Sequence, residues 1–479
     1  MKQTLVNSLA GVGLLITPTL LFANLVGEGP RLAPEDRITQ GQIVEGELTL
    51  DEIRRAGMLI FSTPFNRYDG YGDGPHDESQ PDNHSADAGN RPTLQGNGTF
   101  LRVNGLDSQN CLECHSIVSN RTVPPTMGIG GGGGFSTSAM LRPVNIDVID
   151  ESFDGTAEYD GRLINPLFLF GSGGIELVAR EMTFELQGLK QYALDNPGTV
   201  VSLDTKSVNF GTIVADEDGN LDTSNVKGVD EDLVVRPFGR KGDVASAREF
   251  AMDALSFHMG MQATEKFGGE DADEDNDGVT NEISVGDLSA ISIFVTTLDR
   301  PFKIESTKNT DGRKLFSQIG CADCHRPVMT TERRKLPYKL TGSPEAPFED
   351  TFYEVDLSKP PTIFKTIFGA GVEVEMFSDL KRHDMGIALS ETAFFLDEVQ
   401  NREFITARLW GVADTAPYMH DGRALTLVEA ILLHDNPGSD AGYAAENFQN
   451  LTDEDKNKIL YFLMSLRMPR DPVSDLINR

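Results

Sequence analysis

The stretch Cys111-Leu112-Glu113-Cys114-His115 has a second copy in this chain, Cys321-Ala322-Asp323-Cys324-His325. Together the two segments use all four cysteines of the 479 residues. Cys-X-X-Cys-His is the attachment sequence of c-type haem, in which the thiols bind the haem covalently and the histidine becomes an axial ligand of the iron. The pattern therefore predicts two covalently bound haems, with His115 and His325 as their proximal ligands.

Two other roles are open to paired cysteines. A structural zinc site needs four ligands in one place, whereas these pairs lie about two hundred residues apart in the sequence. A redox dithiol needs no histidine beside it. Haem attachment explains more of the motif than either role, and since it uses every cysteine we expect no disulfide.

The amino terminus predicts export. Lys2 precedes an apolar run from Leu9 to Ala23 that Pro18 interrupts, and this is the pattern of a signal peptide rather than of a bilayer-spanning helix. We expect cleavage after Ala23, so that residues 1–23 are removed. Covalent haem attachment takes place outside the cytoplasm, and the two observations together predict the periplasm.

The charge limits the kind of partner. A formal net charge of −32 disfavours nucleic acid, because like charges repel. Solubility is one explanation of this charge, and steering of a basic electron-donor protein is the other. No stretch after residue 23 approaches 18 unbroken apolar residues, so we expect a mature chain that does not span a membrane.

The roughly 450 remaining residues exceed what one hydrophobic core holds, and they predict two domains. We expect a mainly α fold of two cytochrome c-like haem domains, with long loops and little β-structure. The first domain is predicted over 24–300 and the second over 301–479. A short helix over 312–320 and a closing helix over 453–466 would frame the second domain in the manner of a cytochrome c.

Further helices are expected from the spacing of apolar residues, at 50–61, 174–194, 244–259 and 285–298. The polar segment 66–98 and the glycine run 128–134 predict long loops.

The segment 268–282 predicts a calcium site. Acidic residues alternate there before Gly278, and such oxygen ligands can enclose calcium. The spacing does not fit an EF-hand, because the twelfth position counted from Asp273 is Ser284, and a solvated acidic loop is the alternative. The predicted ligands are Asp273, Asp275, Asp277 and Glu282.

Two further segments carry a resemblance. Residues 407–434 read ARLWGVADTAPYMHDGRALTLVEAILLH, and residues 377–386 read FSDLKRHDMG. Both resemble the bacterial dihaem cytochrome c peroxidase superfamily, in particular its branch of dihaem oxidoreductases, which is associated with peroxidases and thiol oxidoreductases. The resemblance covers roughly residues 54–467, and it implies that the two haems have different roles.

For the second haem, the resemblance implies a distal ligand at the end of the helix after the His-Asp-Gly-Arg loop. That residue is methionine in the peroxidases and tyrosine or histidine in relatives, and here it is His434, which implies a haem held by His325 and His434. A surface histidine favoured by the helix dipole is the alternative, and Met385 and Met419 are weaker ligand candidates. Since methionine raises a haem potential, histidine implies a lower one.

For the first haem, the resemblance implies the reactive iron. After His115 no histidine occurs before His258, and Met127 is the only nearby alternative ligand, so we predict an open distal face. Relatives carry an acid–base glutamate after an aromatic-Asp-Gly-Arg element. Here Tyr159 begins that element, and Glu176 follows it.

The resemblance thus implies that Glu176 moves a proton during peroxide cleavage and that Tyr159 relays electrons between the haems. A helix-terminal carboxylate and a core tyrosine are the alternatives.

The resemblance as a whole implies a periplasmic peroxidase. Hydrogen peroxide would be reduced at the first haem, with electrons supplied through the second by a small donor protein, a cytochrome or a cupredoxin. A dihaem oxidase that acts on an organic or protein substrate and a pure electron-transfer protein are the alternatives. Relatives often form homodimers, and the resemblance extends that expectation to this chain.

Overall fold

The computed structural model describes residues 32–72, 108–115, 117, 142–143, 161–162, 165–267, 269–273, 277–367, 369–391, 398–470 and 473–477. The predicted signal peptide at 1–23, Met127, Tyr159 and Asp275 lie outside these residues. Within the described part, no helix is long and apolar enough to cross a bilayer.

In the first part of the chain the helices are α1 (Gln40–Val44), α2 (Leu50–Ser62), α3 (Ser172–Asp195), α4 (Ala247–Met259) and α5 (Val285–Thr296). In the second part they are α6 (Thr307–Gln318), α7 (Glu398–Arg402), α8 (Leu427–Leu433), α9 (Gly442–Gln449), α10 (Asp453–Leu463) and α11 (Ser474–Ile477). The structure confirms the six predicted helices, α2 to α6 and α10, with ends that differ by a few residues, and it has α8 where the resemblance implied a helix. The sequence did not predict α1, α7, α9 and α11. Short 3-10 turns cover Pro34–Asp36, Cys111–Glu113, Cys321–Asp323, Ile387–Leu389 and Val412–Asp414.

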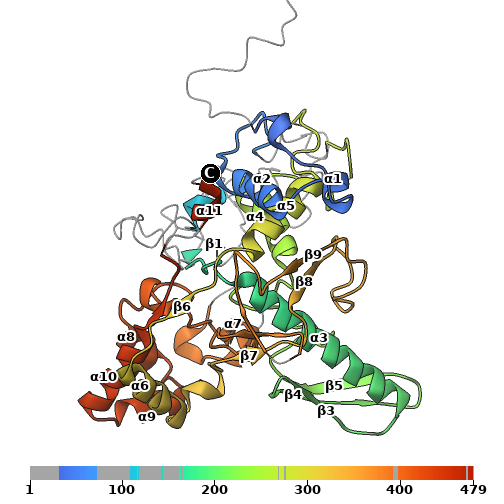
Figure 1. Cartoon of the computed structure of the whole chain (residues 1–479). Helices are drawn as coiled ribbons and strands as arrows, with labels where there is room; N and C mark the ends of the chain where they lie inside the picture. Colours follow the sequence, from blue (N-terminus) through green and yellow to red (C-terminus); the bar gives the residue numbers. More distant parts are fainter. Residues whose placement is uncertain are drawn as a thin grey trace, which may run out of the picture.

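Helices α2 and α5 cross in close contact in the upper part of the molecule (Figure 1). Gly57 permits this approach, because a Cβ added to it would lie 2.2 Å from the carbonyl oxygen of Ala290. Four residues after Gly57, the ring of Phe61 meets that of Phe294 edge to face, with centroids 5.7 Å apart. The crossing therefore depends on a glycine and an aromatic pair.

Helices α6 and α10 cross in the same way in the lower part of the molecule. A Cβ on Gly312 would lie 2.0 Å from the carbonyl oxygen of Lys458. Four residues after Gly312, Phe316 meets Phe462 edge to face, with centroids 5.4 Å apart. The two helix pairs are thus copies of one packing arrangement, which the sequence analysis did not detect.

A three-stranded antiparallel sheet lies against α3 and extends away from the rest of the chain (Figure 1). It consists of β3 (Val201–Thr205), β4 (Val208–Ala215) and β5 (Leu221–Val226) in sequence order. Side chains of β3 alternate between buried and exposed, as expected for a strand with one covered face. The chain therefore contains more β-structure than the sequence predicted.

The other sheets are small. The strands are β1 (Arg142–Pro143) with β2 (Gly161–Arg162), β6 (Phe302–Lys303) with β14 (Leu466–Arg467), β8 (Lys335–Tyr338) with β9 (Tyr353–Asp356), β12 (Arg382–Asp384) with β13 (Glu403–Ile405), and β7 (Met329–Thr330), β10 (Lys365–Thr366) and β11 (Val372–Val374) in the order β10-β11-β7.

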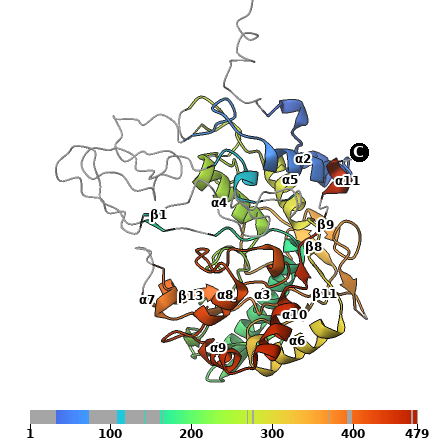
Figure 2. The same ribbon diagram turned by 90° about the vertical axis from the view of Figure 1, so that its left-hand side faces the viewer.

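The end of the chain returns to its beginning. Helix α11 lies beside α2 in both views (Figures 1 and 2). Arg54 of α2 is 1% exposed, and it forms an ion pair with Asp475 of α11 and a hydrogen bond with Thr297. The predicted boundary near residue 300 stays a prediction, and the ion pair between Arg54 and Asp475 crosses it.

Candidate haem sites

The two Cys-X-X-Cys-His motifs fold alike. The first begins with the 3-10 turn Cys111–Glu113, and the amide of His115 donates to the carbonyl of Cys111 at 2.8 Å. The second begins with the turn Cys321–Asp323, and the amide of His325 donates to the carbonyl of Cys321 at 3.0 Å. Each motif thus gathers two thiols and an imidazole within one turn, which suits attachment to one porphyrin.

The structure brings His325 and His434 together. Their ring centroids are 6.5 Å apart, at an interplanar angle of 62°. Metal–imidazole bonds are about 2 Å long, so two rings on opposite sides of one metal ion have centroids roughly 6 Å apart. The spacing between His325 and His434 therefore fits two axial ligands of one iron.

Hydrogen bonds leave the correct ring nitrogens available. Nδ1 of His325 lies 3.2 Å from the carbonyl oxygen of Phe377, and Nδ1 of His434 lies 2.7 Å from that of Ala430. Since carbonyls only accept, both Nδ1 atoms carry the proton, and each Nε2 can bind a metal. Ligating histidines are commonly held in this way.

Both imidazoles are also neutral, as iron ligation requires. Desolvation, together with the nearby His434, lowers the pKa of His325 to about 4. Desolvation also lowers the pKa of His434. His434 occupies the C-cap position of α8, as the alternative of a helix-terminal histidine also requires, and its role as an iron ligand stays a prediction.

The first motif has a histidine neighbour that the sequence analysis did not assign. Desolvation, together with the charge of His258, lowers the pKa of His115 to about 4. His258 lies in the last turn of α4. The expected open distal face stays a prediction, and His258 is the described side chain that bears most directly on it.

Backbone hydrogen bonds connect the segment that follows α2 both to the first motif and to the end of α4. After α2, the amide of Phe65 donates to the carbonyl of Gln109 at 2.9 Å, just before the motif. Seven residues later, the amide of Gly72 donates to the carbonyl of Met259 at 3.1 Å. These contacts are far apart in sequence, so no local pattern could have predicted them.

Glu176 is buried, at 2% exposure, and its carboxylate is fully engaged. One oxygen accepts two hydrogen bonds from the guanidinium of Arg180, at 3.0 and 2.7 Å, and the other accepts from the amide of Ala247 at 3.0 Å. A helix rises 1.5 Å per residue, so Ala247 and His258 lie roughly 16 Å apart along α4. Glu176 has a structural role here, and its acid–base role stays a prediction.

The described carboxylates of the acidic loop shape its turn. Asp273 accepts from the amides of Asp277 and Gly278, at 3.1 and 3.0 Å. Asp277 accepts from the amide of Val279 at 2.7 Å, and Glu282 accepts from that of Gln262 at 2.7 Å. Because Asp275 lies outside the described residues, the calcium site stays a prediction.

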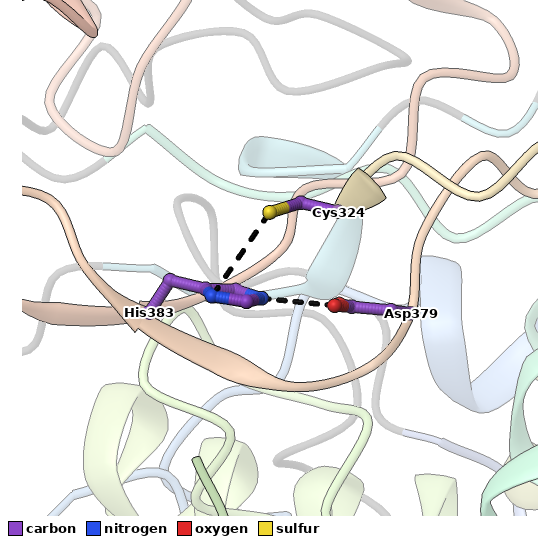
Figure 3. A group of neighbouring side chains, drawn as sticks. All are labelled: Cys324, Asp379 and His383. Carbon is purple, nitrogen blue, oxygen red and sulfur yellow. Dashed lines mark hydrogen bonds and ion pairs between the residues drawn. The ribbon is translucent and has the colours of Figure 1, made fainter. Parts of the chain in front are cut away.

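A third cluster lies beside the second motif (Figure 3). Asp379 and Nε2 of His383 are 2.9 Å apart, and Nδ1 of His383 lies 4.0 Å from the sulfur of Cys324. Within the described ranges, this is the group of three potential ligands that could hold a metal ion.

Two arguments oppose a metal ion there. Although desolvation lowers the pKa of His383, hydrogen bonds with Asp379 and Cys324 raise it to about 10, which favours a proton over a metal ion on this ring. A thioether at Cys324 would also remove the thiolate ligand. The pair of Asp379 and His383 is better described as an ion pair against the second motif.

Comparisons with known proteins agree with the resemblance. Residues 360–466 match the model of the family described as "Di-haem oxidoreductase, putative peroxidase". No curated protein matches this chain.

Two solved structures are similar at low identity. One is hydrazine synthase of Kuenenia stuttgartiensis, pressurised with xenon, at 14% identity and a TM-score of 0.35, over 97% of this chain and 100% of the other. The second is a MauG-like protein associated with microbial copper homeostasis, at 15% identity and a TM-score of 0.28, over 62% of this chain and 89% of the other. The segment that matches the family model, residues 360–466, contains His383 and His434, and this match agrees with the resemblance that the sequence indicated.

Proposed function

We propose that this chain is an exported dihaem c-type oxidoreductase that reduces hydrogen peroxide at the haem attached beside His115. Electrons would reach that site through the haem held by His325 and His434. The observation that carries the proposal is the spacing of these two rings, 6.5 Å between centroids. A haem iron with two protein ligands transfers electrons, whereas one with an open position binds peroxide.

The side chains at the two haem sites support different roles. His325 and His434 hold their ring orientations through the carbonyls of Phe377 and Ala430, so the second site is rigid and suited to electron transfer. The imidazole of His115 lies close to the backbone of Leu167. Two groups are candidates for proton transfer to peroxide: Glu176, from the resemblance, and His258, from its proximity to His115.

Export and partners complete the proposal. We place the protein in the periplasm, where the net charge of −32 would attract a basic donor, a small cytochrome or a cupredoxin. A homodimer, a calcium ion in the loop 268–282 and an electron relay through Tyr159 are part of the same proposal. So are the predicted domains 24–300 and 301–479.

One observation favours a second candidate, a dihaem oxidase that acts on an organic or protein substrate. His434 stands where the peroxidases have methionine, and histidine lowers the potential of a haem relative to methionine. A low-potential haem accepts electrons poorly from a high-potential cytochrome, but it can help to store oxidising equivalents.

The test uses the full chain exported with its haems. Haem content is measured first, and two covalent haems per chain are expected. Electron paramagnetic resonance of the oxidised protein should show one low-spin and one high-spin haem, and a reduced small cytochrome should be consumed when peroxide is added. Two low-spin haems in every redox state, without peroxide turnover, would leave only an electron-transfer protein. A high-spin haem without peroxide turnover would favour the dihaem oxidase.

A further inference from the structure

Arg408 lies near both proximal histidines. It directly follows Ala407, whose backbone lies close to the imidazole of His325. Its guanidinium lies 5.8 Å from the ring centroid of Phe168, and Phe168 directly follows Leu167, whose backbone lies close to the imidazole of His115. Arg408 therefore neighbours a residue beside His325 in the sequence, and it contacts the neighbour of a residue beside His115.

The segment that contains Phe168 is firmly docked on the second half of the chain. The amide of Asn165 donates to the carbonyl of His420 at 2.8 Å, and its side-chain nitrogen donates to those of Pro417 and Met419 at 2.8 and 3.0 Å. At the other end of the segment, a Cβ on Gly171 would lie 2.6 Å from the ring of Trp410. These contacts hold the segment that contains Phe168 against the residues that follow Arg408 in the sequence.

The charge of Arg408 is not balanced by the described residues. The side chain is buried, at 8% exposure. Its Nη1 donates to the carbonyl of Pro237 at 3.0 Å, but its buried Nε has no hydrogen-bond partner within the described ranges. Desolvation lowers the pKa of Arg408 to about 10, with no carboxylate acting against it.

Other buried arginines of this chain show the contrast. Arg54 pairs with Asp475, Arg180 with Glu176, and Arg248 with Glu265. An unpaired ion costs several kcal/mol to bury, so a guanidinium without a counter-ion requires an anion from elsewhere. The fork of an arginine matches a carboxylate with two parallel hydrogen bonds.

We propose that Arg408 is the buried counter-ion of a haem propionate at the junction of the two motifs. The proposal rests on haem attachment at both motifs, but it does not depend on the reaction catalysed. A fixed cation near a haem stabilises the reduced form, which carries one positive charge less. Arg408 is thus a positioning residue that raises the potential of the haem whose propionate it binds.

The test is a redox titration of the haem-loaded protein in three variants. Arg408→Gln should keep both haems and lower the midpoint potential of one of them, and Arg408→Lys should restore most of the loss because it keeps the charge. Arg236→Gln, which removes an arginine paired with Asp232, is the control and should move neither potential. A shift of the low-spin haem assigns the propionate to the His325 site, and a shift of the other haem assigns it to the His115 site.

Unchanged potentials in Arg408→Gln, at full haem content, would overturn the proposal. Equal shifts in the Gln and Lys variants would overturn it as well, because the lysine keeps the positive charge that the glutamine removes. Should the Gln variant not fold, Arg408→Lys carries the test through redox-difference infrared spectra, in which the propionate carboxylate band should shift relative to wild type. An unchanged carboxylate band would contradict the proposed contact between Arg408 and the propionate.

The two proposals fail separately. Two haems without peroxide turnover would contradict the proposed function alone, whereas absence of haem would remove both.

Discussion

Gly312 of α6 lies directly against Lys458 of α10, so that a Cβ at residue 312 would come within 2.0 Å of the Lys458 carbonyl oxygen. Gly57 of α2 has the same relationship with Ala290 of α5, at 2.2 Å. Each glycine is followed four residues later by a phenylalanine in edge-to-face contact with the opposite helix. The chain therefore contains the same helix crossing twice. In each case one helix precedes a haem-attachment motif in the sequence and the other follows it.

This relationship predicts that Gly57→Ala and Gly312→Ala each destabilise the protein. The new methyl group would press on a backbone carbonyl that cannot move aside, and overpacking of this kind costs about 1–3 kcal/mol or more. Thermal melts of the haem-loaded protein measure the effect. Gly188→Ala on α3 is the matched control, because nothing lies within 4 Å of its Cβ position and alanine is favoured in a helix by up to about 1 kcal/mol. Melting temperatures that change alike in all three variants would contradict the packing argument.

A second prediction concerns His434. Replacement by alanine should convert the low-spin haem of the second motif to a high-spin or weakly ligated form, because one of two axial ligands is lost. Replacement by methionine should instead keep six ligands and raise the midpoint potential. Absorption spectra and redox titration measure both changes.

Added imidazole provides the control for His434→Ala, since it should return the haem to its low-spin state. If the spectrum of the second haem is the same in wild type and His434→Ala, then another residue ligates the iron, and Met385 and Met419 become the candidates.

Glu176→Gln distinguishes a structural role of Glu176 from a chemical one. Arg180 would lose its buried carboxylate partner, which typically costs about 3–5 kcal/mol, so we expect a lower melting temperature. Peroxide turnover per folded molecule decides between the two candidates for proton transfer: turnover that changes little would favour His258, because Glu176 is hydrogen-bonded at the opposite end of α4. The half-exposed Glu185, changed to glutamine on the same helix, is the control. A hundredfold or larger fall in turnover without a change in melting temperature would instead support the acid–base role that the resemblance implies.

The sequence predicted those parts of the fold that depend on local patterns. Helix α10, predicted over 453–466, spans Asp453–Leu463, with Thr452 as its N-cap and with Ile459 and Leu463 buried. The strands β3 to β5 were missed, although the alternation of Val201, Leu203 and Thr205 is a strand signal.

The residues of the candidate haem sites were likewise predicted only in part. The pairing of His325 with His434 was accessible because a family resemblance links their positions. The proximity of His258 to His115 and of Arg408 to Phe168 was not, since each depends on contacts between segments far apart in the chain. The repeat of Gly57 and Gly312 was hidden for a related reason: α6 leads directly into its motif, whereas nearly fifty residues separate α2 from the first motif.

The last prediction concerns Asp299, close to Arg54 and Asp475. Desolvation, together with the charge of Asp475, raises the pKa of Asp299 from 3.8 to about 6, against the opposing effect of Arg54. Between these values the folded state binds more protons than the unfolded state, so the contribution of Asp299 to stability falls as the pH rises from about 4 to about 6.

Asp299→Asn should therefore melt at a higher temperature than wild type at pH 7, and the difference should shrink toward pH 4. Asp311→Asn, on the exposed face of α6, should show no such dependence on pH. A difference between Asp299→Asn and wild type that stays constant from pH 4 to pH 7 would mean that Arg54 neutralises Asp299 in the folded state, and that Arg54 holds both carboxylates where α2 meets the end of the chain.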